Sequence, residues 1–480
     1  PEFRDVSATP ARVPAGAGKG STAIRLRLAD LLGISLYELD RLDLTVSATL
    51  DRTLQQTVSD YLTDLARPDF AREAGIIGER LLTPSQVGNV HYSFTLVEQT
   101  PDGSRVRVQT DTTDQPLDIN EGSKLELGST AKLRVLATYL ELVAELHKRF
   151  SALPNEALRG TAVERQDMLT RWALDYLIGA RDRSLPAMLE AALNRRFSAS
   201  PAESFFTGGG LHTFSNFQRE DDERVVTVRE ALQASINLPF VRVMREIVRH
   251  TMYRVPGSTA KLLEDHSDPR REEYLAKFAD REGQVFLRRF WRKYQGLAPH
   301  EMQDSLLAGL RPTVHRLAAS FRYLNPGADV QAFSAFMAER LPGVRIGEAR
   351  LGALYRRYAP GAFDLPDQGY IARVHPLELW LVGFLSAHPG ASFAEAVEAS
   401  RAERQAVYRW LFRTRAKSAQ DQRIYTILEV EAFLEIHRRW ARLGYPFPHL
   451  VPSLATALGS SGDRPAALAE LMGVIVNDGI

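Results

Sequence analysis

The hydrophobic pattern changes its period between residues 90 and 150, and this change sets what the middle of the chain can fold into. Apolar and polar residues alternate over residues 90–97, which predicts a strand. A Pro-Asp-Gly turn follows at 101–103, and valines at 106 and 108 continue the alternation. From Leu133 to Phe150 the apolar residues recur with helical spacing. We therefore predict a β-hairpin that leads directly into an amphipathic helix.

The predicted helix begins with a serine and a lysine three residues apart. Ser129 stands where the helix should start, and Lys132 follows it. Residues three apart on a helix share a face, so the amine should lie beside the hydroxyl at a helix N-terminus, where negative charge is favoured. A neutral lysine can take the proton of a serine and make its oxygen a nucleophile. The structural alternative is that Ser129 caps the helix and Lys132 is a solvated residue of its first turn.

The composition is that of a folded protein and excludes several kinds of chemistry. Of the 480 residues, 44% are hydrophobic and 25% charged, and the net charge of +1 predicts no binding to a polyanion such as nucleic acid. The absence of cysteine excludes disulfides, thiol catalysis and cysteine metal sites. No stretch is long and apolar enough for a membrane span, and no signal peptide is visible. Because the chain starts without methionine and stops in an apolar run, we expect an internal piece of a longer protein.

Five regions are predicted along the chain. Residues 1–20 are expected to be a flexible lead-in, and residues 21–88 an N-terminal linker or pedestal. Residues 89–250 are expected to form a core that carries the polar motifs. Residues 251–449 are dense in arginine and helix-period apolar residues, which predicts a helical insertion. The core is expected to continue in residues 450–480.

Local patterns give further boundaries. We predict a helix over residues 21–41, a strand over 42–50 and a helix capped by Asp51. Residues 160–197 are expected to be helical, with a break at Leu185-Pro186. Thr227 is predicted to open a helical region, and residues 450–480 are expected to form one helix.

A second polar motif lies at a predicted break in this helical region. Ser235-Ile236-Asn237 is the only Ser-x-Asn in the sequence. A serine on such a loop can relay a proton between a lysine and a leaving amine, and an asparagine can hold that lysine and a substrate amide. The structural alternative is a turn with polar caps.

Together these motifs resemble the transpeptidase half of bifunctional (class A) penicillin-binding proteins. The resemblance covers residues 42–250 and 450–480, and residues 235–242 are its most specific part. The matching stretches are Thr49-Leu50-Asp51 with Leu54-Gln55, Gly128-Ser129-Thr130-Ala131-Lys132, Gly208-Gly209-Gly210-Leu211-His212-Thr213-Phe214, Thr227-Val228-Arg229-Glu230-Ala231-Leu232, Ser235-Ile236-Asn237-Leu238-Pro239-Phe240-Val241-Arg242 and Ala457-Leu458-Gly459-Ser460-Ser461. The resemblance implies the α/β (α+β) fold of penicillin-binding proteins and serine β-lactamases, an antiparallel sheet flanked by helices, here with a large helical insertion.

The resemblance also implies roles for the polar residues. Ser129 would be the acylated nucleophile and Lys132 its base, while Ser235 would relay protons and Asn237 would position Lys132 and the substrate. The implied enzyme is a serine D,D-transpeptidase that cross-links peptidoglycan stem peptides through their D-Ala-D-Ala ends and binds penicillin and other β-lactams covalently. It would use no cofactor and no metal.

Location and partners follow from the same resemblance. The domain would be extracytoplasmic, on the periplasmic side of the inner membrane, with a membrane anchor and a glycosyltransferase domain upstream of this piece. Cell-wall synthesis proteins would be its partners, and nucleic acid would not. Two alternatives stay open: a hydrolase of the D,D-carboxypeptidase or β-lactamase type, and a catalytically silent cell-wall scaffold domain.

Some features depart from the family pattern. The third family motif, Lys-Thr/Ser-Gly, is absent; we expect it beyond residue 480, and genuine loss of the motif is the alternative. A second Ser-Thr-Ala-Lys at 258–261 is expected to be a helix cap. Glu190 lies in a sequence like that of a β-lactamase deacylation loop, but we expect a solvated helix residue; His212 is expected to be a structural loop residue. No His/Asp/Glu spacing predicts a metal site.

Arginines gather in the last part of the predicted insertion. They stand at positions 401, 404, 409, 413 and 415. We expect a solvated helix face that is partly paired with Glu403 and its neighbours. Contact with anionic membrane lipid is the alternative.

Overall fold

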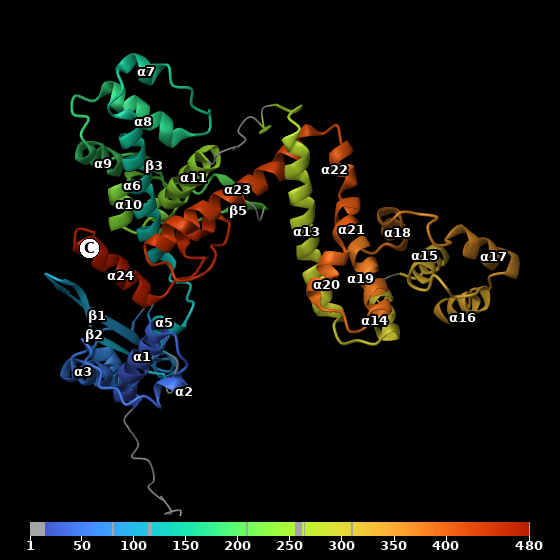
Figure 1. Ribbon diagram of the computed structural model, residues 1–480, viewed down its shortest axis with the longest axis horizontal. Coiled ribbons are helices and arrows are strands. Elements are labelled where there is room, and N and C mark those ends of the chain that lie inside the picture. The colour runs from blue at the N-terminus through green and yellow to red at the C-terminus, as the bar shows by residue number, and fades with distance from the viewer. Residues whose placement is uncertain are drawn as a thin grey trace, which may run out of the picture. The chain divides into compact units, whose positions relative to one another are not determined.

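The chain divides into two compact units. The computed structural model describes residues 15–78, 81–113, 118–207, 210–254, 262–263, 265–308 and 311–479. Unit 1 comprises residues 1–255 and 429–480, and unit 2 comprises residues 256–428. The described residues combine many helices with two-stranded antiparallel sheets (Figure 1), so the fold is mixed α and β.

Unit 1 carries all of the described strands. They are β1 (Ser93–Thr100), β2 (Gly103–Asp111), β3 (Arg196–Ser198), β4 (Ser204–Thr207), β5 (Gly210–Thr213) and β6 (Val225–Thr227). Its helices are α1 (Ala15–Leu32), α2 (Leu36–Leu39), α3 (Arg52–Asp64), α4 (Pro68–Glu73), α5 (Ile119–Gly122), α6 (Ala131–Phe150), α7 (Asn155–Arg159), α8 (Met168–Gly179), α9 (Leu185–Leu193), α10 (Val228–Gln233), α11 (Asn237–Arg254) and α24 (Pro465–Val476). Short 3₁₀ turns are η1 (Val87–Asn89), η2 (Gly128–Thr130), η3 (Arg219–Asp221) and η4 (Leu454–Leu458).

The predicted hairpin is present. β1 and β2 pair antiparallel around the turn that ends at Gly103, where φ is +117°. Helices α1 and α3 pack against β2, and α24 packs against β1. Two further antiparallel pairs are present: β4 pairs with β5, which follows it directly, and β3 pairs with β6, which lies further along the chain. The sheets described here are therefore small, and each has two strands.

The N-terminal boundaries differ from the predictions. Helix α1 begins at Ala15, inside the predicted lead-in of residues 1–20, of which 1–14 lie outside the described part of the chain. Gly33, with φ +66°, ends the helix that was expected to continue to residue 41. Residues 42–50 are not a strand: only their end contacts β2, through Thr49, so the alternating segment has no partner for a ladder. Asp51 caps α3 as predicted, by accepting from the backbone N–H of Leu54 at 3.0 Å.

The core of unit 1 surrounds helix α6. Its apolar face is buried against α8, α9 and α11, with Val135, Tyr139, Leu142 and Leu146 almost fully enclosed. The predicted helix over 160–197 is interrupted, because α9 ends at Leu193 and Arg196 begins β3. The predicted single helix over 450–480 is also two elements, η4 and α24, separated by a turn that contains Gly459 at φ +95°.

Unit 2 is helical, as predicted for the insertion. It contains α13 (Arg270–Tyr294), α14 (Pro299–Leu307), α15 (Val314–Leu324), α16 (Val330–Arg340), α17 (Glu348–Arg357), α18 (Leu365–Ala372), α19 (Pro376–Ala387), α20 (Phe393–Ala399), α21 (Arg401–Val407), α22 (Arg409–Arg413) and the start of α23 (Lys417–Arg442). Two apolar clusters form its core, one around α13 and α19 and one around α15 and α16.

The predicted end of the insertion at residue 449 is wrong. Residues 429–449 belong to unit 1. Trp440 explains the difference, since its ring is buried and its indole N–H donates to Thr138 of α6 at 3.0 Å. Helical spacing alone cannot show where one long helix passes from one core into another.

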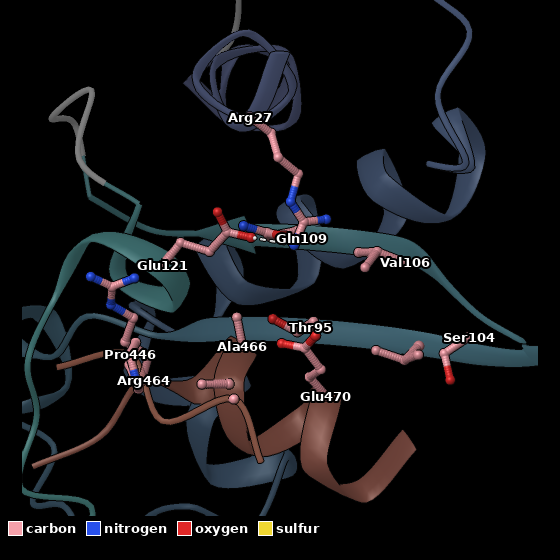
Figure 2. A pocket seen from close by; sticks show the side chains of 13 residues that line it. Arg27, Thr95, Ser104, Val106, Gln109, Glu121, Pro446, Arg464, Ala466 and Glu470 are labelled. Carbon is pink, nitrogen blue, oxygen red and sulfur yellow. Dashed lines mark ion pairs between the residues drawn. The ribbon is translucent and has the colours of Figure 1, made fainter. Parts of the chain in front are cut away.

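A hollow of about 300 Å³ lies within unit 1 beside the hairpin (Figure 2). One face of the hairpin, including Thr95 and Gln109, lines it together with α1 and α24. Arg27 of α1 reaches Glu121 of α5 across this hollow, at 3.4 Å. Among the described residues, no helix combines the length and the apolar character needed to cross a membrane.

Candidate active site

The structure brings together the four residues that the sequence singled out. The Lys132 Nζ atom lies 3.0 Å from Ser129 Oγ and 3.1 Å from Ser235 Oγ. It also lies 2.7 Å from Asn237 Oδ1 and 2.5 Å from the carbonyl oxygen of Ser235. Lys132 is only 1% exposed, whereas both serines are exposed. A buried amine therefore lies directly beneath two hydroxyl groups that face solvent.

Ser129 is presented by a tight turn at the start of α6. Gly128 precedes it with φ +55°, a backbone conformation that side chains rarely allow. Ser129 then lies in η2, and α6 begins at Ala131, so Lys132 falls one turn after Ser129 on the same face. The N–H groups of Thr130 and Ala131 donate to the carbonyl oxygens of Leu127, at 3.3 Å, and Gly128. The N-terminus of α6 is the end of the helix at which negative charge is favoured.

Ser235 and Asn237 are held by the junction between α10 and α11. A capping box begins α10: the Thr227 side chain accepts from the N–H of Glu230, and the Glu230 carboxylate accepts from the N–H of Thr227. Ser235 follows in the left-handed region, with φ +54°, which costs on the order of 1 kcal/mol for a residue with a side chain. This conformation lets both its carbonyl and its hydroxyl oxygen lie close to Lys132.

The orientation of the Asn237 amide is fixed on both sides. Its Nδ2 donates to the carbonyl oxygen of Ser215 at 3.0 Å, so its Oδ1 faces Lys132. Asn216 supports the same loop by accepting from the N–H of Leu238 at 3.1 Å. Asn237 therefore offers an acceptor, not a donor, to the amine.

The surroundings of Lys132 favour its neutral form. Burial lowers the pKa of Lys132 from 10.5 to about 8. No carboxylate of the described chain lies within hydrogen-bond distance of its amine. The nearest ring is that of Phe240, 6.0 Å from the amine. An amine with this pKa is a stronger proton acceptor at neutral pH than an ordinary lysine, because a larger fraction of it is unprotonated.

Hydrogen-bond counting shows where the lone pair of the neutral amine must point. A neutral lysine has two N–H groups and one lone pair. The Ser235 carbonyl and Asn237 Oδ1 can only accept, so they take both hydrogens. The lone pair is left facing the hydroxyl groups of Ser129 and Ser235. The cluster can therefore remove a proton from one serine and exchange it with the other.

A second buried contact fixes the turn before Ser129. Arg134, fully buried, donates through Nε to Asp463 at 2.5 Å. Asp463 exchanges two backbone hydrogen bonds with Leu125, at 3.1 and 2.8 Å. Gly459 approaches Gly128 so closely that an added Cβ would lie 2.6 Å from its nitrogen. Sequence reasoning missed Arg134 and Asp463, since 329 positions separate them.

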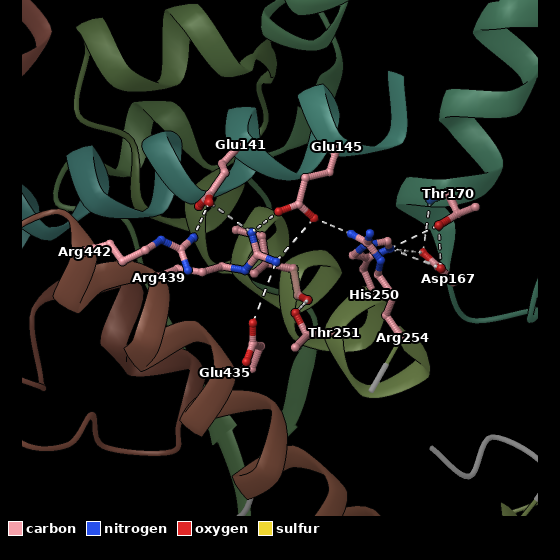
Figure 3. A network of polar contacts seen from close by, with 11 residues as sticks. Glu141, Glu145, Asp167, Thr170, His250, Thr251, Arg254, Glu435, Arg439 and Arg442 are labelled. Carbon is pink, nitrogen blue, oxygen red and sulfur yellow. Dashed lines mark hydrogen bonds and ion pairs between the residues drawn. The ribbon is translucent and has the colours of Figure 1, made fainter. Parts of the chain in front are cut away.

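The far end of α6 is held by a network of ion pairs (Figure 3). Glu145 contacts Arg439 of α23 at 2.7 Å and also pairs with Arg254 at the end of α11. Burial opposes ionisation of Glu145, but these two guanidinium groups outweigh it and hold the pKa of Glu145 below its usual value. Arg439 also contacts Glu141, at 3.3 Å. The network ties the helix that carries Lys132 to the helix that begins with Asn237.

The remaining candidates lie apart from this cluster. Glu190 is exposed and pairs with Arg229 at 2.7 Å, as expected for a solvated residue. His212 is exposed on β5 opposite Phe205. Ser258 and Lys261 lie outside the described residues, as do Gly208 and Gly209. In the part of the chain that the structure describes, no group of three or more acidic or histidine side chains could hold a metal ion.

Comparisons of this chain with family models, with curated proteins and with solved structures returned no match. The function is therefore inferred from the arrangement of the site residues alone. The structure places the amine of Lys132 beside two serine hydroxyls, an arrangement of groups that is chemically suited to acyl transfer.

Proposed function

We propose that the chain is the transpeptidase domain of a class A penicillin-binding protein, with Ser129 as its acylated nucleophile. The observation that carries this proposal is the buried Lys132 amine, whose nitrogen lies 3.0 Å from the hydroxyl oxygen of Ser129 and 3.1 Å from that of Ser235. The substrate would be the D-Ala-D-Ala end of a peptidoglycan stem peptide. β-Lactams would acylate the same serine, because they mimic that dipeptide.

The reaction would proceed in two balanced steps. Ser129 Oγ attacks the carbonyl carbon between the two D-alanines, and its proton passes to the neutral Lys132. The C–N bond then breaks, and the departing D-alanine amine receives a proton through Ser235. An amine of a second stem peptide attacks the ester carbon and loses a proton to Lys132 through the same relay. The ester C–O bond breaks, and the departing Ser129 Oγ takes that proton back from Lys132. Backbone N–H groups of the first turn, including that of Ser129, would stabilise the oxyanion.

Hydrolysis is the weaker alternative. A carboxypeptidase or β-lactamase needs a base that activates water for deacylation. Glu190, the one candidate from the sequence, pairs with Arg229 on the surface instead. A catalytically silent scaffold is also disfavoured, because an unneeded buried lysine without a counter-ion would cost stability for no return.

Labelling with a fluorescent penicillin tests the proposal. The full-length protein should form a stable covalent adduct, and Ser129→Ala should abolish it. Ser258→Ala is the matched control, because it alters the other Ser-Thr-Ala-Lys and should leave labelling intact. Labelling that survives Ser129→Ala, or that is lost in Ser258→Ala, contradicts the proposal; rapid release of the hydrolysed drug favours the hydrolase.

A further inference from the structure

One stretch of unit 2 has a charge pattern that the proposed function does not use. Residues 404–420 contain five basic residues and no aspartate or glutamate. The same stretch contains Tyr408, Trp410 and Phe412. Basic residues interleaved with aromatic ones are typical of segments that lie at a membrane surface.

The basic side chains of this stretch fall into two groups. Arg404 is buried and pairs with Asp280 at 2.5 Å, so it is structural, contrary to the predicted solvated face. Arg409, Arg413, Arg415 and Lys417 are exposed. Of these, Arg409 reaches a carboxylate, that of Asp364, only at 3.9 Å, and none of the other three is paired with a carboxylate among the described residues. Four cations therefore face solvent with little neutralisation.

An exposed tryptophan lies among these cations. Trp410 is 54% exposed, although its neighbour Leu411 is fully buried. An open hollow of about 520 Å³ adjoins the ring and is lined by Arg409, Arg413 and Pro366. The short helix α22 packs against α13 and buries Leu411, while Trp410 of the same helix remains exposed. We call the exposed side chains of Arg409, Trp410, Arg413, Arg415 and Lys417 the Trp410 patch.

We propose that the Trp410 patch binds the surface of a membrane that contains anionic lipids. Arginine and lysine attract phosphate headgroups, and the hollow beside Trp410 can receive one of them. Tryptophan prefers the interface between headgroups and acyl chains, so its ring would enter that layer. An anionic lipid surface satisfies both parts of the patch. A soluble polyanion would use the cations and leave the ring exposed.

The experiment uses the full chain and vesicles of defined composition. The 480-residue chain should sediment with vesicles of phosphatidylglycerol and phosphatidylcholine, and not with vesicles of phosphatidylcholine alone. Binding should fall as salt is added, because the attraction is screened. Arg413→Ala with Arg415→Ala should weaken binding about 30-fold, since each basic residue near an anionic surface contributes about five-fold.

Matched variants separate the patch from net charge. Arg356 and Arg357 are also exposed in unit 2, and replacing both by alanine removes the same charge. This control should weaken vesicle binding by less than threefold. Trp410→Ala should lower binding to anionic vesicles, whereas Tyr370→Ala, which removes an aromatic residue that is 68% exposed, should not.

The vesicle-binding results test the proposed role of the Trp410 patch independently of acylation at Ser129. Equal binding to both kinds of vesicle, or an equal loss in the Arg356 and Arg357 control, overturns the proposal. A soluble polyanion is the partner if the protein binds isolated peptidoglycan strands or heparin as tightly as vesicles, and if Trp410→Ala leaves that binding unchanged. This result also overturns the proposal.

Discussion

Two buried cations stand two residues apart on helix α6, and their surroundings are opposite. Arg134 is fully buried and pairs with the carboxylate of Asp463 at 2.5 Å. Lys132 is equally buried but contacts only neutral oxygen atoms, and burial lowers its pKa to about 8. The surroundings of Arg134 neutralise a permanent positive charge. The surroundings of Lys132 disfavour a positive charge, which lysine can lose with its proton.

The difference separates a structural cation from a reactive one. Arginine keeps its proton at any ordinary pH, so its burial requires a counter-ion. Lysine can lose its proton, so burial without a counter-ion turns it into a base. The sequence places both residues on one helix, and only the partners show which role each one has.

The largest expected effect comes from removing Arg134, the buried cation that pairs with Asp463. Arg134→Met should lower the free energy of unfolding by about 3–5 kcal/mol, because the buried Asp463 carboxylate then loses its counter-ion and keeps only the backbone N–H of Arg464 as a donor among the described residues. Chemical denaturation followed by circular dichroism measures the loss. Asp463→Asn in the same chain should recover part of it, and a double variant that is as unstable as the sum of the single variants argues against a direct pair.

Replacing Lys132, the buried cation without a counter-ion among the described residues, should raise the free energy of unfolding. Burial depresses the pKa of Lys132 in the folded state, so the charged amine destabilises the fold. This destabilisation is complete below about pH 8 and is lost as the pH rises toward 10.5. Lys132→Met should therefore stabilise the fold by about 1–2 kcal/mol at pH 7, after the lost hydrogen bonds are subtracted. The gain should shrink at pH 10. Lys148→Met, an exposed residue of the same helix, serves as the control and should change stability by less than about 0.5 kcal/mol.

The smallest effect concerns the rate of acylation. The base must be neutral, so the rate should rise with pH through an apparent pKa near 8. Between pH 7 and pH 9 the neutral fraction grows from about one tenth to about nine tenths, which predicts a roughly tenfold faster acylation by penicillin. Stopped-time labelling across this range measures it. A rate that is flat from pH 6 to pH 9 would show that Lys132 is not the base.

Local chemistry was predictable from spacing, and the long-range contacts of Lys132 with Ser235 and Asn237 were predicted only through the family resemblance. The hairpin, the caps at Asp51 and Thr227 and the pairing of Ser129 with Lys132 all follow from spacing within a few residues. The alternation of apolar and polar residues over 42–50 wrongly predicted a strand, because a strand also needs a neighbouring strand with which to pair. The contact of Arg134 with Asp463 depends on the whole fold, and so does the role of the Ser235 carbonyl, which rests on one positive φ.

Glu145 has a consequence for how this chain is assembled. Arg254 is the last described residue of α11 before the chain leaves unit 1, and Arg439 lies on α23, where the chain has returned. One carboxylate contacts both arginines (Figure 3), so Glu145 joins the segment of unit 1 that precedes unit 2 in the chain to the segment that follows it. Unit 2 lies between these two segments in the sequence, as an inserted domain does. A helical domain inserted at such a point can be gained, lost or exchanged during evolution while the serine and lysine of α6 keep their positions.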